Sequence, residues 1–284
     1  MSDDPPVRGS QASRIDLRRA LAVALSIGGY LAALAAYLVI SEGQPLAPGG
    51  DLLAYLRAAS DLLAGREVYV GQIGDAAAFA YAPTWAIGFA AVSWLPPALL
   101  QLVIVALDLG AIRYVSGSWR ATGYVLWVPL MAFVMASGNI DLLIAAAIVM
   151  AWRGRGAPLA ILGLAKVAPL LGLPIPWQRQ VFVTLFVAFL ITLPWLGLWV
   201  DWIGFLFRQP MMIRISLPIG PWWFRLPIAL GLLIPRRSYL SGLAVVVAMP
   251  SLYLSTLTIL IAPLFLFLQE RRGSVAVRAA DISA

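Results

Sequence analysis

The run ALAVALSIGGYLAALAAYLVI, residues 20–40, decides the fold class because it is apolar throughout and contains no charged residue. About 20 consecutive apolar residues are what a helix needs to cross the hydrocarbon core of a bilayer. The run is too long for the apolar core of a signal peptide, and no clear small-residue cleavage site follows it. Arginines precede it within residues 1–19. Since basic segments stay on the cytoplasmic side, we expect residues 1–19 to be a cytoplasmic tail.

The rest of the chain has the same character. Of its 284 residues, 62% are hydrophobic and only 12% are charged, whereas soluble domains are about 45–50% apolar and about 25% charged. Lipid tolerates such a chain if each backbone polar group is paired inside its own segment. We predict an all-α, polytopic transmembrane helical bundle of about ten spans, forming one domain over residues 20–268, with a cytoplasmic tail at 269–284. After the first span, the expected spans are 82–95, 97–114, 121–136, 139–152, 157–176, 180–200, 218–235, 239–249 and 252–268.

The ten-span order leaves one conflict. It places Arg120 and Arg153–Arg155 outside, against the rule that basic loops stay inside. The alternative makes 82–114 one kinked passage and 157–176 a re-entrant hairpin, which puts Ser137–Asp141 outside. We favour ten spans, because a helix over 82–114 at about 1.5 Å per residue overshoots the core.

Residues 41–80 form the first predicted extracytoplasmic loop, since acids outnumber arginines there. Within it, DLLAYLRAASDLLAG (51–65) predicts an amphipathic helix that ends at Gly65 and lies at the outer membrane surface. Residues 201–226 form the second large outer loop. The apolar stripe expected on the surface helix comprises Leu52, Leu53, Leu56, Ala59 and Leu63.

Composition also limits the chemistry. The chain has no cysteine and no histidine, so acid–base work falls to carboxylates, tyrosines or the single lysine, Lys166. The net charge of +7 comes from arginines scattered between apolar runs, which indicates topology rather than a nucleic-acid partner. The patterns GxxxxGK[ST], GxGxxG, HExxH and DxD are absent, which argues against the usual soluble nucleotide chemistry.

Ionisable residues inside a membrane are costly, so each is a functional hypothesis. Lys166 either pairs with a buried carboxylate or points at an anionic ligand. Asp141 either pairs with Lys166 or caps a helix that follows Ser137–Gly138–Asn139. Asp108, near a membrane edge beside Arg113, is expected to be structural. Asp51 opens the surface helix and is either its N-cap or a chemical group.

Several short patterns occur in order between about residues 50 and 265. They are Asp51 followed by Tyr55, Gly65 and Tyr69; Phe79, Tyr81 and Pro83, followed by the break at Leu95–Pro96; SGNIDLL at 137–143; GLAKVAP at 163–169; and MPSLYLST at 249–256, with Pro263 downstream. This series resembles the bacterial polyprenyl-phosphate-mannose-dependent mannosyltransferases of the GT-C superfamily. The chain departs from that family in its altered Gly–Gln motif, and in Ser255 and Thr256, which stand where the family has histidines.

The resemblance implies an inverting hexosyltransferase of the plasma (inner) membrane, with both termini cytoplasmic and an extracytoplasmic active site. The donor would be a polyprenyl-phosphate sugar, most simply mannose, and the acceptor a hydroxyl of a lipid or glycan. No metal or other cofactor is required. Asp51 would be the catalytic base. The expected substrate-binding residues are Tyr55, Arg57, Tyr81, Asn139, Asp141, Lys166, Arg208, Arg214 and Arg225.

Two other functions stay open. One is a transporter or flippase for a lipid or polar solute, with Asp108, Asp141 and Lys166 lining the path. We see no repeat between the two halves of the chain, a feature of many transporters. The other is a catalytically degenerate GT-C-like subunit. Sugar transfer by the purified protein separates the three.

Overall fold

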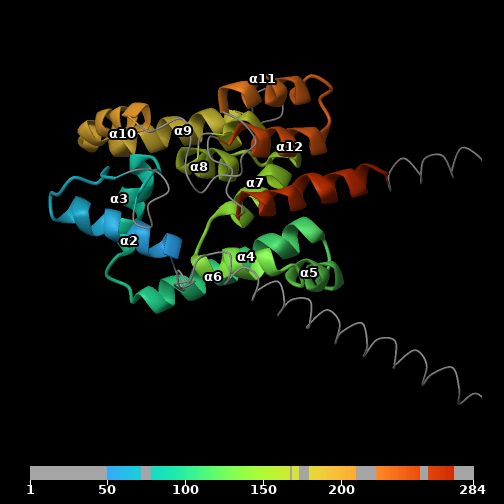
Figure 1. Cartoon of the computed structure of the whole chain (residues 1–284), viewed down its shortest axis with the longest axis horizontal. Helices are drawn as coiled ribbons and strands as arrows, with labels where there is room; N and C mark the ends of the chain where they lie inside the picture. Colours follow the sequence, from blue (N-terminus) through green and yellow to red (C-terminus); the bar gives the residue numbers. More distant parts are fainter. Residues whose placement is uncertain are drawn as a thin grey trace, which may run out of the picture.

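The computed structural model describes residues 50–71, 78–166, 168–172, 179–208, 222–249 and 255–271 (Figure 1). Within these ranges every regular element is a helix, which confirms the all-α prediction. The predicted first span, the N-terminal tail, most of the C-terminal tail and Arg214 lie outside the described residues.

The helix predicted over 51–65 is present as α2, Gly50–Leu63, and its place at the outer membrane surface stays a prediction. It buries Tyr55 and its two neighbouring alanines, Ala58 and Ala59, and packs closely on α3, Pro83–Val92. The predicted apolar stripe is partly wrong, because Leu53 and Leu63 are 52% and 67% exposed. Small residues let two helices approach closely, so the helix turns its alanine face to α3 and its outer leucines away from the protein.

The next three helices form a bent hairpin. Helix α4 (Pro97–Ser116) is followed by α5 (Trp119–Leu126) and α6 (Pro129–Ser137), and α5 and α6 meet at an angle of 87°. Proline stands in the first turn of both α4 and α6, where its missing N–H costs nothing. Helix α6 returns to the start of α4, since the Gln101 amide nitrogen donates to the carbonyl oxygens of Met135 and Ala136 at 2.8 and 3.2 Å.

Helix α7, Asp141–Trp152, runs through the centre of the bundle. It is apolar all round and almost wholly buried, as expected of a helix enclosed by others. Helices α4, α8 (Ala157–Ala165) and η3 (Ser255–Leu260) surround it. At about 1.5 Å per residue α7 is roughly 18 Å long, so it does not cross a bilayer alone.

Helix α8 and the short helix η1, Ala168–Gly172, lie between two residues, Gly156 and Gln180, that contact each other. The backbone N–H of Gly156, just before α8, donates to the side-chain oxygen of Gln180 at 3.2 Å. Gln180 lies in the first turn of α9, Arg179–Thr192. Gly156 and Gln180 therefore lie at one level of the bundle, the geometry expected of the re-entrant alternative.

Helix α9 continues through η2, Leu193–Trp195, into α10, Leu196–Arg208. The expectation that 201–226 forms a loop is therefore wrong where the structure describes it, because residues 201–208 are helical and α11 begins at Trp222. The loop was predicted to begin at Asp201, but α10 continues past it, because a single acid does not end a helix whose other face is apolar.

Helices α11 (Trp222–Leu233) and α12 (Ser238–Ala248) form a second hairpin beside η1. The chain then passes through η3 into a final helix over 261–271. Figure 1 shows the turn between α11 and α12, helix α5 and the far end of the final helix on the same side of the molecule, whereas α2, α3 and α10 lie on the opposite side.

Contacts between side chains join these helix ends. The guanidinium of Arg153, after α7, lies over the Tyr114 ring of α4 at 4.8 Å, and Arg113 lies over Trp119 of α5 at 5.5 Å. Trp152 donates to the Ser241 hydroxyl of α12. We call this region the basic end. Its arginines are Arg113, Arg120, Arg153, Arg155, Arg179, Arg236, Arg237 and Arg271, and Glu270, which accepts from Ser238, is its one acid within the described ranges.

Two of the described helices, Pro97–Ser116 and Arg179–Arg208, are long and apolar enough to cross a bilayer, and the bent pair α5–α6 would be a third. These helices suit a helical membrane protein. The total of ten spans stays a prediction. Its order puts Asp51 and Asn139 on opposite faces, but the Asn139 amide donates to the Asp51 carboxylate at 3.0 Å. The re-entrant alternative puts both residues on one side and agrees with this contact.

Gly138 provides a test of this packing. It has φ of +74°, and a Cβ there would lie 3.0 Å from Leu52 Cβ and 3.2 Å from Gln101 Oε1. Gly138→Ala should therefore lower the free energy of unfolding by about 1–2 kcal/mol for the left-handed backbone plus about 1–3 kcal/mol for crowding. Gly154, with φ of +85° and open space around it, is the control, since Gly154→Ala incurs only the backbone cost. Equal losses in detergent unfolding would show that α2 does not seat against the turn at Gly138.

Candidate functional site

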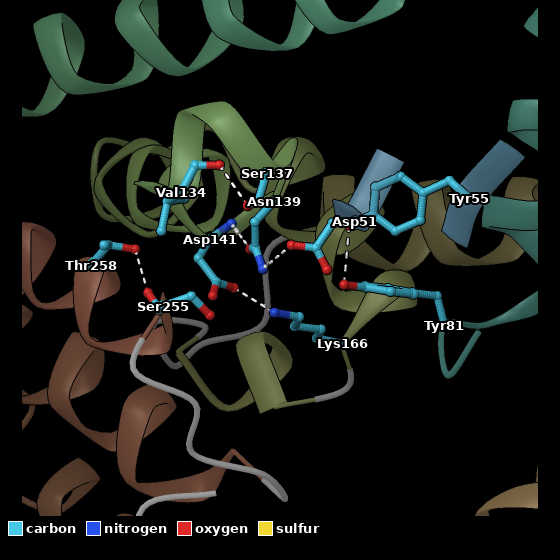
Figure 2. A network of polar contacts seen from close by, with 10 residues as sticks. All are labelled: Asp51, Tyr55, Tyr81, Val134, Ser137, Asn139, Asp141, Lys166, Ser255 and Thr258. Carbon is cyan, nitrogen blue, oxygen red and sulfur yellow. Dashed lines mark hydrogen bonds and ion pairs between the residues drawn. The ribbon is translucent and has the colours of Figure 1, made fainter. Parts of the chain in front are cut away.

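Polar side chains from separate elements converge between α2 and α7 (Figure 2). Asp51 comes from the first turn of α2, Asn139 and Asp141 from the turn into α7 and its first residue, and Lys166 from the end of α8. Tyr81 comes from the segment before α3 and faces Lys166. Four of the predicted substrate-binding residues and the predicted base are thus brought together.

Asn139 connects Asp51 to the start of α7. Its Nδ2 donates to Asp51 Oδ2 at 3.0 Å, and its Oδ1 accepts the backbone N–H of Asp141 at 2.9 Å. A side chain that bonds the backbone two residues ahead forms an Asx turn, for which asparagine is well suited. Asn139, not Asp141, therefore caps the start of α7. The same contact holds the Asn139 side chain with its NH₂ group toward Asp51.

Asp141 takes the other role and pairs with Lys166. The Lys166 ammonium lies 2.6 Å from Asp141 Oδ1, and the Asp141 side chain is fully buried. The Lys166 backbone is extended where α8 ends, which lets the chain turn into η1. The Lys166 side chain keeps 18% exposure and its ammonium lies 5.9 Å from the centre of the Tyr81 ring. Because an ammonium carries three donors, this pairing leaves donors for a ligand.

The Asp51 carboxylate is half-buried and interacts with Asn139, Ser137 and the charges of Lys166 and Asp141. Its contacts in the described ranges are with α6–α8, not with N–H groups of its own helix, which speaks against a simple N-cap. Burial raises the pKa of Asp51 above its ordinary value, while Lys166 and the Asn139 hydrogen bond act in the opposite direction. A carboxylate with a raised pKa is a stronger base than a solvated one.

An aromatic wall supports one side of the site. The Tyr55 hydroxyl donates to the Tyr81 hydroxyl at 3.1 Å, and the Tyr69 hydroxyl donates to the Tyr81 carbonyl at 3.1 Å. The ring of Tyr55 also contacts Trp85 and Phe89 at centroid distances of 6.1 and 4.8 Å. Burial raises the pKa of Tyr55 and of Tyr81, so both phenols stay neutral and serve as hydrogen-bonding groups.

A cavity of about 340 Å³ lies behind this wall, between α3, α8 and α9. Trp85 and Phe89 separate it from Tyr55, and Leu164 places it two residues before Lys166 along α8. Its lining is apolar except for the Thr84 hydroxyl, which is buried and has no partner within the described residues. The cavity therefore suits an apolar chain that approaches the polar cluster from the side.

The predicted arginines do not join the cluster. Arg57 is exposed on α2 and lies 3.8 Å from Asp61. Arg208 is exposed at the end of α10. Arg225 is buried in α11 and donates to the Val247 carbonyl at 3.2 Å, so the prediction that it lies in an outer loop is wrong. A basic residue in an apolar run gives no sequence signal that separates a ligand contact from a bond to a backbone carbonyl.

Asp108 was expected to be structural beside Arg113, but Arg113 stacks on Trp119 instead. Asp108 is fully buried in α4, and neither of its carboxylate oxygens has a hydrogen-bond partner in the part of the chain that the structure describes. The charge of Asp141 acts on it electrostatically. Sequence analysis also missed Gln101; its seven-residue spacing from Asp108 on one buried helix face was the available signal.

Comparison with known proteins adds no relative: no family model, no curated protein and no solved structure matches this chain. The GT-C resemblance therefore stays a prediction that depends on the residues quoted for it.

The ion pair makes a clear prediction for stability. Lys166→Met should lower the free energy of unfolding by about 3–5 kcal/mol, because it leaves the Asp141 charge buried and uncompensated. Adding Asp141→Asn to Lys166→Met should recover much of that loss. The measurement is thermal or denaturant unfolding of the purified single and double variants. Additive losses in the double variant would contradict the pairing.

Proposed function

We propose that this chain is a membrane glycosyltransferase that moves a hexose from a polyprenyl-phosphate donor to a hydroxyl acceptor. The observation that carries the proposal is the placement of Asp51. Its carboxylate is half-buried, oriented by Asn139 and within electrostatic reach of Lys166. A base beside a cation, with an apolar cavity on the far side of the aromatic wall, meets the chemical needs of transfer from a lipid phosphate.

In this proposal Asp51 accepts the proton of the acceptor hydroxyl as its oxygen attacks the anomeric carbon. The new carbon–oxygen bond forms as the bond from the anomeric carbon to the phosphate oxygen breaks, and the phosphate leaves with the electron pair. One direct displacement inverts the anomeric carbon. A positioned base of this kind contributes roughly 10²–10⁴-fold to the rate.

The departing phosphate gains negative charge, so a cation must meet it. Lys166 is the cation that the structure brings closest to the cluster among the described residues. Its pairing with Asp141 holds the ammonium in place, and its partial exposure leaves it within reach of a ligand. Arg208 is exposed at the end of α10 and is a second candidate for this role; Arg214 remains a third.

The apolar cavity supports the choice of a lipid-borne donor. A sugar on an isoprenoid tail needs an apolar approach that reaches the reacting carbon from the side. The space between α3, α8 and α9 offers one, with Leu164 close in sequence to Lys166. A donor dissolved in water would not need it.

The orientation proposed for the chain follows from its charges. The eight arginines of the basic end would face the cytoplasm, together with both termini. Asp51 lies on α2, which Figure 1 shows on the side away from the basic end, so the active site would open outside the cell. The localisation we propose is a multi-pass protein of the plasma membrane.

One observation favours a second function. Asp108 is buried without a hydrogen-bond partner in the described ranges and lies near the Asp141–Lys166 pair. Intramembrane acids of this kind often line ion or proton paths. A transporter or flippase would place solute there rather than transfer sugar. Uptake into vesicles without any transfer product would favour this function over the enzyme.

The enzyme proposal is tested at Asp51. Asp51→Asn should remove most sugar transfer, while stability at neutral pH stays near that of the parent, because Asn keeps an oxygen for the Asn139 amide and burial disfavours the carboxylate charge. Asp51→Glu should retain a trace, since its carboxylate is displaced by one methylene. The assay uses purified protein, a polyprenyl-phosphate sugar with mannose tried first, and acceptors extracted from the source membrane. Transfer at the parent rate by Asp51→Asn would remove the base from the mechanism.

The pH profile is a second test of the same group. The base works only when ionised, so activity should fall as pH drops through the pKa of Asp51. Burial raises that pKa, so the acid limb should lie above the ordinary aspartate value of 3.8. The measurement is the rate against pH at saturating donor. An acid limb at or below that value would contradict a half-buried base.

Topology can be tested directly because the chain has no cysteine. Glu67→Cys, exposed just after α2, should react with a membrane-impermeant thiol reagent in intact cells. Arg155→Cys, exposed at the basic end, should react only after permeabilisation. The reverse pattern would invert the proposed orientation while leaving the chemistry of the site unaffected.

A further inference from the structure

The arginines of the basic end share an arrangement that the other end lacks. Four of them lie over aromatic rings: Arg113 over Trp119 at 5.5 Å, Arg153 over Tyr114 at 4.8 Å, Arg120 over Tyr124 at 6.0 Å, and Arg271 over Phe267 at 4.8 Å. Contact with a ring limits how a guanidinium can turn, and the Nε of Arg120 also donates to the Tyr124 hydroxyl at 3.3 Å. These side chains are therefore pre-oriented.

Arg113, Arg120 and Arg153 form no ion pair with an acid in the ranges that the structure describes. The contrast is at the opposite end, where Arg57 and Arg66 both pair with Asp61, at 3.8 and 2.8 Å. Among the described residues, the basic end thus keeps an excess of positive charge, with Glu270 as its one acid. Such an excess of positive charge attracts anions from outside the chain.

The exposure of the aromatic rings indicates the kind of environment in which these arginines lie. Trp119 and Tyr124 are 65% and 63% exposed, although each is large and largely apolar. Tryptophan and tyrosine collect where the hydrocarbon of a membrane meets its headgroups. Arginine binds phosphate oxygens through two parallel N–H bonds. An exposed ring beside an oriented guanidinium therefore matches a lipid whose tail is apolar and whose headgroup carries phosphate.

We propose that the basic end is a binding surface for anionic phospholipid headgroups, held mainly by Arg113, Arg120 and Arg153. The partner is a lipid with net negative charge, such as phosphatidylglycerol. A zwitterionic lipid would be bound more weakly, because its own cation competes for the phosphate. This proposal does not depend on whether the chain transfers sugar.

The test uses the full chain in neutral detergent, with thermal unfolding followed as phosphatidylglycerol or phosphatidylcholine is titrated in. Phosphatidylglycerol should raise the unfolding midpoint of the parent more than phosphatidylcholine, and added salt should reduce the difference. The triple variant Arg113→Gln, Arg120→Gln, Arg153→Gln should need on the order of 100-fold more phosphatidylglycerol for half the effect, since each arginine near an anionic surface contributes about fivefold. The control Arg57→Gln, Arg66→Gln should titrate like the parent.

Several results would overturn the proposal. The triple variant could titrate like the parent, or the control could lose as much as the triple variant, which would show only a response to net charge. Inorganic phosphate at the same concentration could reproduce the whole effect, which would indicate a free-anion site. If the triple variant does not fold, Arg120→Gln alone decides, because this side chain is exposed on α5; its titration should shift by about fivefold, and no shift would refute the surface.

Discussion

The buried ion pair between Lys166 and Asp141 is the constraint on which the centre of this protein depends. A charge taken out of water is tolerated only when a partner of opposite sign and further hydrogen bonds accompany it. Asp141 is fully buried at the start of α7, so Lys166 must reach it at 2.6 Å. That requirement fixes where α8 ends and the chain turns into η1. Asn139, bonded to the Asp141 backbone, then fixes the position of Asp51.

The sequence was a good guide wherever local physics decides the structure. An apolar chain with few charges predicted an all-helical membrane fold, and the leucine and alanine spacing predicted α2 to within a residue or two. The order of weak motifs named Asp51, Tyr55, Tyr81, Asn139, Asp141 and Lys166, and the structure brings these together. Apart from Tyr55, which lies within α2, each stands next to a helix start, a helix end or a turn, where glycine, proline and asparagine leave readable signals.

Contacts between distant elements could not be predicted in the same way. Arg225 was expected in a loop, but it donates to Val247 across a helix hairpin. The run at 157–176 was long enough for a span, but Gly156 and Gln180 on either side of it contact each other. Which face of α2 is buried depended on α3, not on α2 alone. In each case the deciding partner lies elsewhere in the chain, and a single sequence does not contain the pairing.

The sequence separations within the site set an order for its assembly during synthesis. Asp141 and Lys166 are 25 residues apart, so α7 and α8 can pair as soon as both have left the ribosome. Asp51 is 88 residues from Asn139, so α2 emerges long before the residue that orients it. The aspartate therefore gains its hydrogen-bond partner only once the start of α7 is in place. A chain stopped before Lys166 would hold Asp51 without the cation that the folded protein places near it.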